Sequence, residues 1–128
     1  MEKETVGKVY REVYLKKTSS VTKKDWVTVY IRKHRKYWKG SFDYFILPKV
    51  ICSDGFTVSM QISKVHYCMP KTASAERYTH TELGFPSVGD PLIKDYAEDP
   101  EDETNTVYPY VPIEVVNALF EKHGGISN

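Results

Sequence analysis

The stretch that decides the fold is FILPKVICSDGFTVSMQIS, residues 45–63. Two runs rich in strand-forming residues, Phe45–Ser53 and Phe56–Ser63, flank the dipeptide Asp54-Gly55. This dipeptide suits the positive φ angles of a tight turn between antiparallel strands. The stretch therefore predicts a β-hairpin.

Side-chain alternation assigns the two faces of the second strand of this hairpin. A two-residue turn places Cys52 opposite Thr57 and Ile51 opposite Val58. One face is apolar and is expected in the core: Val58, Met60 and Ile62. The other face carries hydroxyl and amide groups and no charge: Thr57, Ser59, Gln61 and Ser63.

The strongest helix prediction lies near the C-terminal end, after the extended segment Tyr108–Pro112. Pro112 suits a first helical turn, Glu114 suits the positive helix N-terminus, and Gly124-Gly125 favours termination. One apolar stripe consists of Ile113, Val116, Leu119 and Phe120. We expect an α+β fold: a small, mainly antiparallel β-sheet with this C-terminal α-helix packed on it.

Shorter patterns predict the remaining elements. Residues Trp26–Arg32 alternate with Val27, Val29 and Ile31 on one side, which predicts a strand. The run Val6–Leu15 is compatible with a strand or a short helix. The other expected elements are a hairpin loop at Lys16–Lys24, a strand at Tyr78–Phe85, a short helix at Pro91–Ala97 and an exposed acidic loop at Glu98–Glu103.

Length and composition indicate one soluble domain over residues 1–128. Apolar residues make up 41% of the chain and charged residues 27%, an ordinary globular balance. No apolar run approaches the roughly 18 residues of a membrane-spanning helix, and no secretory segment follows the charged start. We therefore expect a cytoplasmic protein without a membrane partner, with both cysteines as free buried thiols.

Charge is distributed unevenly along the chain. Residues 1–49 carry 13 Lys and Arg against 5 Asp and Glu, whereas residues 50–128 carry 5 against 12. The two halves therefore carry +8 and −7, which gives the net charge of +1. Such a division can recruit an anionic ligand to the first half, or it can be neutralised within the fold or between subunits.

The sequence contains no nucleotide-binding glycine loop, nucleophile elbow or zinc-protease motif. His66 and Cys68 would share one face of a strand, and Cys52 on a neighbouring strand could complete a three-ligand metal site. We favour instead a buried thiol beside a hydrogen-bonded histidine. The prediction is a binding protein rather than an enzyme, without a catalytic residue, metal or cofactor.

The basic and aromatic stretch WVTVYIRKHRKYWK, residues 26–39, is the strongest binding signal. Its arginines can hold phosphates through paired hydrogen bonds, and its aromatic rings can stack on bases. The alternative is a surface element whose aromatic side chains face the core while its lysines keep it soluble.

Several segments resemble a small protein family of phages and prophages. The matching pieces are Leu47–Phe56, Val58–Ser63, His66–Pro70, Leu83–Ser87, Tyr96–Asp99, Thr106–Val116 and Lys122–Gly125. The resemblance covers about residues 46–126, whereas the basic residues 1–45 match no family. No activity is established for this family, so the resemblance implies a phage setting, in which small proteins without catalytic motifs often inhibit host defence.

The leading prediction is a phage-encoded anti-defence protein that sequesters a small cyclic or signalling nucleotide without cleaving it. The expected ligand-binding residues are Trp26, Tyr30, Arg32, Arg35, Gln61, Ser63, His66 and Tyr67. One alternative is an inhibitor that binds a host defence or polymerase protein, and another is an accessory protein that binds RNA or DNA. We also expect a homo-oligomer, because a small chain builds a deep pocket more easily between subunits.

Overall fold

The computed structural model describes residues 6–18, 24–41 and 45–128. Four strands form one antiparallel sheet in the order β1-β2-β3-β4. The strands are β1 (Val50–Ile51), β2 (Thr57–Gln61), β3 (His80–Gly84) and β4 (Val107–Pro112). The helices are α1 (Val6–Thr18), α2 (Trp26–Arg35) and α3 (Ile113–Lys122), and two short 3₁₀ helices are η2 (Lys94–Tyr96) and η3 (Glu103–Asn105).

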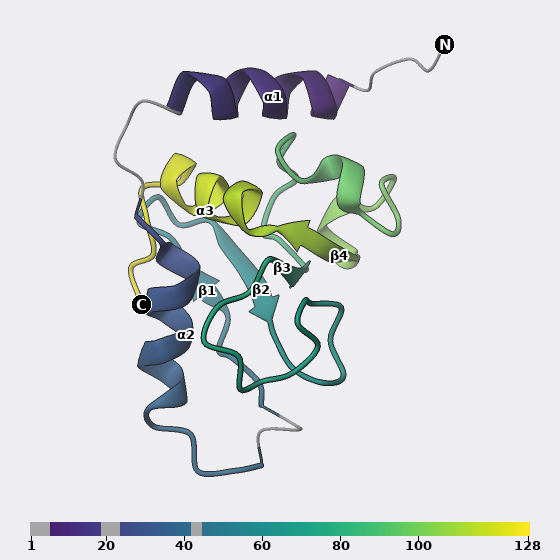
Figure 1. Ribbon diagram of the computed structural model, residues 1–128. Coiled ribbons are helices and arrows are strands. Elements are labelled where there is room, and N and C mark those ends of the chain that lie inside the picture. The colour runs from purple at the N-terminus through teal and green to yellow at the C-terminus, as the bar shows by residue number, and fades with distance from the viewer. Residues whose placement is uncertain (1–5, 19–23, 42–44) are drawn as a thin grey trace.

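The helix α3 packs on the sheet, which confirms the predicted α+β fold. Figure 1 shows α1 above α3, on the side away from the strands, and α2 along one flank of the sheet. The core between these layers contains the predicted apolar face of β2 and the predicted stripe of α3. Its fully buried members include Val58, Met60, Ile62, Leu83, Tyr108, Val116, Leu119 and Phe120.

The strand predicted at Trp26–Arg32 is wrong, because these residues form the start of α2. Asp25 caps the helix: its side chain accepts a hydrogen bond from the amide of Thr28 at 3.1 Å. The buried positions Val27, Thr28, Tyr30 and Ile31 follow helical spacing. Val29, which alternation assigned to the same face as Val27, is 50% exposed.

The predicted hairpin exists, but its register differs by one residue. The loop has three residues, 53–55, so Val50 pairs with Val58 and Ile51 with Thr57. Gly55 supplies the expected left-handed conformation with φ of +95°. The side chain of Asp54 accepts a hydrogen bond from the amide of Phe56, which closes the longer loop.

The first strand of the hairpin is also shorter than predicted, because a side chain replaces the backbone ladder. Gln61 accepts from the amide of Leu47 and donates to its carbonyl, each at 2.9 Å. Pro48, the next residue, has no amide hydrogen for a ladder. Residues 45–49 are therefore fixed to β2 by the Gln61 carboxamide rather than by strand pairing.

Other expectations are mostly confirmed. The Val6–Leu15 run is helical, and α1 extends to Thr18, into the expected loop whose residues 19–23 lie outside the described part. The strand predicted at Tyr78–Phe85 contains β3, and the short helix predicted at Pro91–Ala97 contains the shorter η2. Across the described residues, no helix is both long and apolar enough to cross a membrane.

The two outer strands of the sheet are closed in different ways. The edge strand β4 contains Pro109 and Pro112, which carry no amide hydrogen. At the other edge, Cys52 forms a bridge with Ile126, and the amide of Ser127 donates to the carbonyl of Ile51 at 2.7 Å. The segment 125–128 thus covers the open side of β1.

Candidate functional site

Two of the predicted ligand residues on α2 hold the fold together. Tyr30 is 2% exposed, and its hydroxyl donates to the carbonyl of Pro48 at 2.9 Å. Arg35 donates to the carbonyl of Ala73 and to the hydroxyl of Tyr78. These contacts tie α2 to the segments before β1 and before β3, so both side chains are occupied within the chain.

The other two predicted residues of α2 lie nearer to solvent. The indole nitrogen of Trp26 donates to the carboxylate of Glu121 at 2.6 Å, and the Lys24 ammonium lies 4.1 Å from the indole centroid. Arg32 forms an ion pair of 3.1 Å with Glu76, in which both side chains are largely exposed. Such exposed pairs contribute little to stability.

The four remaining predicted residues come from β2 and the loop after it. Gln61 is 8% exposed and bonded to Leu47, so its amide serves the hairpin. Ser63 is fully buried, and its hydroxyl lies 2.6 Å from Nδ1 of His66. The amide of His66 also donates to the carbonyl of Ser63 at 3.2 Å, so the structure joins these two members of the predicted set. Tyr67 follows at the surface and is 42% exposed.

The structure places a buried thiol beside a hydrogen-bonded histidine, as we favoured. The Cys68 sulfur lies 3.4 Å from the carbonyl oxygens of both Ser63 and Pro70, and its single hydrogen forms a weak hydrogen bond to this pair of acceptors. Burial raises the pKa of Cys68 and lowers that of His66, so both groups are favoured in their neutral forms. Among the described residues, no group of three His, Cys, Asp or Glu side chains is arranged to hold a metal ion.

The ring of Tyr67 lies next to that of Tyr110, a residue that was not among the predicted ligand-binding residues. The two rings are 5.7 Å apart between centroids and inclined at 53°. The amide of Tyr110 donates to the carbonyl of Tyr67 at 3.1 Å, and the amide of Tyr67 donates to the carboxylate of Glu82 at 2.8 Å. Backbone contacts therefore hold the two exposed tyrosines side by side.

A β-bulge creates this arrangement. The pairing of β3 with β4 shifts between Thr81–Val111 and Leu83–Tyr108, so one residue of β3 faces two of β4. Tyr110 lies in the bulge with φ of +52°, a left-handed conformation that is unusual for a residue with a side chain. The bulge turns its ring outward, where 40% of the residue is exposed.

Beside the tyrosine pair lies a cavity of about 340 Å³. Its walls are Cys68, Met69, Pro70, Lys71 and Tyr110. The Lys71 ammonium lies 5.5 Å from the centroid of the Tyr67 ring, within the range of a cation–π contact. We call Tyr67, Met69, Lys71 and Tyr110 the tyrosine site. It combines aromatic faces, a flexible apolar side chain and one cation.

Sequence reasoning missed Tyr110 because its conformation depends on pairing with a distant strand. The local signal was its position between two prolines, which predicted extended backbone and no bulge. Lys71 was missed because it lies in a polar loop without periodicity. Tyr67 was predicted, and the structure supplies its neighbours.

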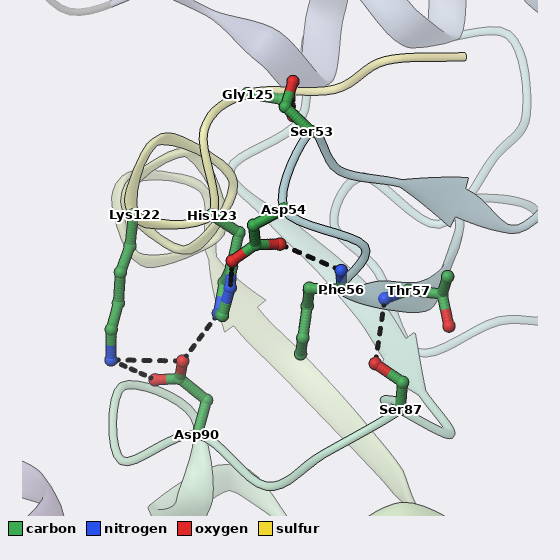
Figure 2. A network of polar contacts seen from close by, with 9 residues as sticks. All are labelled: Ser53, Asp54, Phe56, Thr57, Ser87, Asp90, Lys122, His123 and Gly125. Carbon is green, nitrogen blue, oxygen red and sulfur yellow. Dashed lines mark hydrogen bonds and ion pairs between the residues drawn. The ribbon is translucent and has the colours of Figure 1, made fainter.

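A second polar cluster joins three parts of the chain (Figure 2). His123, just after α3, lies with Nδ1 2.7 Å from Asp54 and Nε2 2.9 Å from Asp90. Its ring stacks on Phe56 at 4.0 Å between centroids, and Lys122 forms a 3.2 Å ion pair with Asp90. The cluster connects the hairpin loop, the segment after β3 and the end of α3, which is a structural role.

Another cavity, of about 660 Å³, does not suit an anionic ligand. Three of its lining residues are the acids Asp90, Asp95 and Glu103, with Lys94 as the cation among them. Asp90 is already paired with Lys122, and Asp95 forms an ion pair with Arg11. A phosphate entering this cavity would lie among three carboxylates, which repel it, and the cations Lys122 and Arg11 are already engaged with two of them.

No protein-family model, curated protein or solved structure matches the chain.

Proposed function

We propose that this protein binds and sequesters a small nucleotide, and that the tyrosine site receives it. A base stacks on Tyr110 and Tyr67, while Lys71 attracts the phosphate. The observation that carries this proposal is the strained, outward-facing Tyr110 at the wall of a 340 Å³ cavity.

The β-bulge imposes the positive φ of Tyr110, and this conformation has an energetic cost. An L-residue in the left-handed region is disfavoured by about 1–2 kcal/mol. Burial offsets only part of this cost, because Tyr110 remains 40% exposed. Strained residues held by their surroundings cluster at functional sites, which supports a binding role for this ring.

The chemistry of the site suits a base and a phosphate together. Stacking of a base on an aromatic side chain contributes roughly 1–3 kcal/mol. The cavity lies at the lower end of the roughly 300–1,000 Å³ found for small-molecule sites. His66 immediately precedes Tyr67 and is hydrogen-bonded to Ser63. Its neutral imidazole ring could form a hydrogen bond with the polar edge of the base.

The biological setting of this proposal comes from the resemblance of residues 46–126 to a phage and prophage family. A phage protein that captures the signalling nucleotide of a host defence system would block that defence without catalysis. Capture without cleavage accords with a sequence in which we found no nucleophile elbow or metal motif.

Calorimetric titration with cyclic dinucleotides, cyclic trinucleotides and ADP-ribose derivatives tests the proposal. At least one ligand class should bind with one ligand per site, and Tyr110→Gly should abolish that binding while relieving the backbone strain. Phe85→Gly is the matched control, because this aromatic residue also has a positive φ, +51°, and is 48% exposed, but it does not line the cavity. Absence of binding across the whole panel would contradict the proposal.

A second function, inhibition of a host protein, is favoured by the apolar exposure around the same site. Val65, Tyr67, Met69 and Tyr110 are 59%, 42%, 50% and 40% exposed, and tyrosine and methionine are enriched in protein interfaces. A host protein retained by the wild type and lost from both Tyr67→Ala and Tyr110→Gly would support this function. Retention by both variants would argue against it.

The proposed nucleotide function also includes self-association. The tyrosine site lies on one chain and is open, so a second copy placed over it would enclose a ligand more fully. Light scattering should then give a mass of two or more chains, at least when ligand is present. A monomer with and without ligand would contradict this part of the proposal.

A further inference from the structure

We infer that the exposed face of α2 is a second binding surface, which takes single-stranded nucleic acid. The surface consists of Lys24, Trp26, Lys33, Lys36 and Tyr37, and we call it the α2 face. It is separate from the tyrosine site in its residues and in the ligand it takes.

Helical geometry gathers these residues on one side. The opposite side of α2 is fixed against the core by Val27, Tyr30 and Ile31. With 3.6 residues per turn, Lys33 and Lys36 project away from that buried side. Both are exposed, and Tyr37 beyond them is 72% exposed.

One acid lies at this face, Glu121, whose carboxylate accepts a hydrogen bond from the indole of Trp26 at 2.6 Å. In the ranges 6–18, 24–41 and 45–128, no ion pair links Lys24, Lys33 or Lys36 to a carboxylate. Lys33 donates instead to the backbone carbonyl of Asn128 at 2.9 Å. Their charge is therefore available to phosphates, whose neutralisation releases counterions and drives binding.

A shallow pocket at the start of α2 provides a place on this face where part of the ligand can bind. Its volume is about 170 Å³, below the range typical of sites that enclose a whole small molecule. It therefore suits one part of a longer ligand that continues along the helix. The residues around it are Lys24, Trp26, Val29, Tyr30, Lys33, Ile126, Ser127 and Asn128.

Aromatic side chains at both ends favour unpaired bases over duplex. Trp26 lines the shallow pocket at the beginning of α2, and Tyr37 lies just past the end of the helix. The ten residues of α2, Trp26–Arg35, span about 15 Å, so the backbone positions of Trp26 and Tyr37 are far enough apart for separate bases of one strand. Stacking of this kind is tolerant of sequence and needs bases that are free of a partner strand.

Fluorescence anisotropy with labelled single-stranded DNA and RNA oligonucleotides, repeated over a series of salt concentrations, tests the inference. Lys33→Gln/Lys36→Gln should weaken binding about tenfold at low salt and reduce the slope of log K against log salt by about 1.4, two phosphate contacts at 0.7 each. Tyr37→Ala should weaken binding about fivefold or more through lost stacking. Comparison of the affinities for DNA and RNA shows which nucleic acid is preferred.

The matched control is Lys64→Gln/Lys94→Gln, which removes the same charge at two exposed positions outside both the α2 face and the tyrosine site. This control should leave oligonucleotide affinity and slope nearly unchanged. Equal weakening by both double variants would overturn the inference, because binding would then depend on net charge alone. Failure of the wild-type protein to bind any oligonucleotide would also overturn it. Calorimetry of Lys33→Gln/Lys36→Gln with the nucleotide panel keeps the two sites apart, since nucleotide binding at the tyrosine site should persist in this variant.

Discussion

Atom Nε2 of His123 lies 2.9 Å from Oδ2 of Asp90, a residue that is 3% exposed. Because an ionised carboxylate only accepts hydrogen bonds, Nε2 is the donor. A buried carboxylate is tolerated only when it is paired and hydrogen-bonded, and His123 supplies part of that compensation. The end of α3 thus stabilises the Asp90 carboxylate, which lies far from His123 in the sequence.

Replacement of this histidine should therefore destabilise the fold. His123→Ala removes both carboxylate contacts and the stacked ring on Phe56. We expect a loss of about 2–4 kcal/mol in the free energy of unfolding, measured by urea denaturation. His80→Ala is the control: its ring is hydrogen-bonded to the adjacent Thr79, and its loss should cost less than about 1 kcal/mol. Similar losses in the two variants would contradict the structural role of His123.

The hairpin loop should make stability depend on pH in acid. Hydrogen bonds from the amide of Phe56 and from His123 lower the pKa of Asp54 below its ordinary value of 3.8. A lowered carboxyl pKa stabilises the fold at pH values above the ordinary one, and this stabilisation is lost as pH falls through the folded-state pKa. Thermal unfolding between pH 2 and 6 should show a steeper acid loss for the wild type than for Asp54→Asn. Parallel curves would exclude this contribution.

The strain at Tyr110 predicts an unusual order of stability. Tyr110→Gly should be more stable than Tyr110→Ala by about 1–2 kcal/mol, because glycine adopts the left-handed conformation without a side-chain clash. Denaturant unfolding of the two variants measures this difference directly. The reverse order would mean that position 110 is not held at positive φ in solution.

Gln61 provides a test that separates structure from ligand recognition. Gln61→Ala removes both hydrogen bonds to Leu47 and leaves a buried amide and carbonyl without these partners. We expect a loss of about 2–4 kcal/mol in the free energy of unfolding, with nucleotide affinity unchanged in the folded fraction. A loss of affinity without a loss of stability would instead restore the predicted ligand role of Gln61.

Both thiols should be unreactive in the folded protein. Burial raises the pKa of Cys52 to about 11 and also raises that of Cys68. Because the thiolate is the reactive form, alkylation at pH 8 should be slow until denaturant is added. Mass spectrometry of iodoacetamide-treated protein measures this. Rapid labelling of either residue under native conditions would contradict its buried position.

The comparison of sequence with structure shows where local patterns suffice. The buried face of β2 and the stripe of α3 follow from alternation and helical spacing, so Met60 and Leu119 were placed correctly. In Trp26–Arg32, β-branched and aromatic residues satisfy a strand pattern and a helical one alike, and the cap by Asp25 marks a helix. Tyr110 lies beyond local reasoning, because a bulge set by pairing with β3 determines its φ angle.

The closed edges of the sheet bear on how this protein behaves at high concentration. A protein that removes a ligand by capture alone must be as abundant as that ligand, and crowded chains with open strand edges tend to join into aggregates. Prolines in β4 deny incoming strands part of their hydrogen bonds, and Ser127 already occupies the carbonyl of Ile51 at the opposite edge. The fold is therefore compatible with a high concentration of the protein, because addition of strands from other copies is obstructed at both edges of the sheet. Copies can then contact one another only through side-chain surfaces.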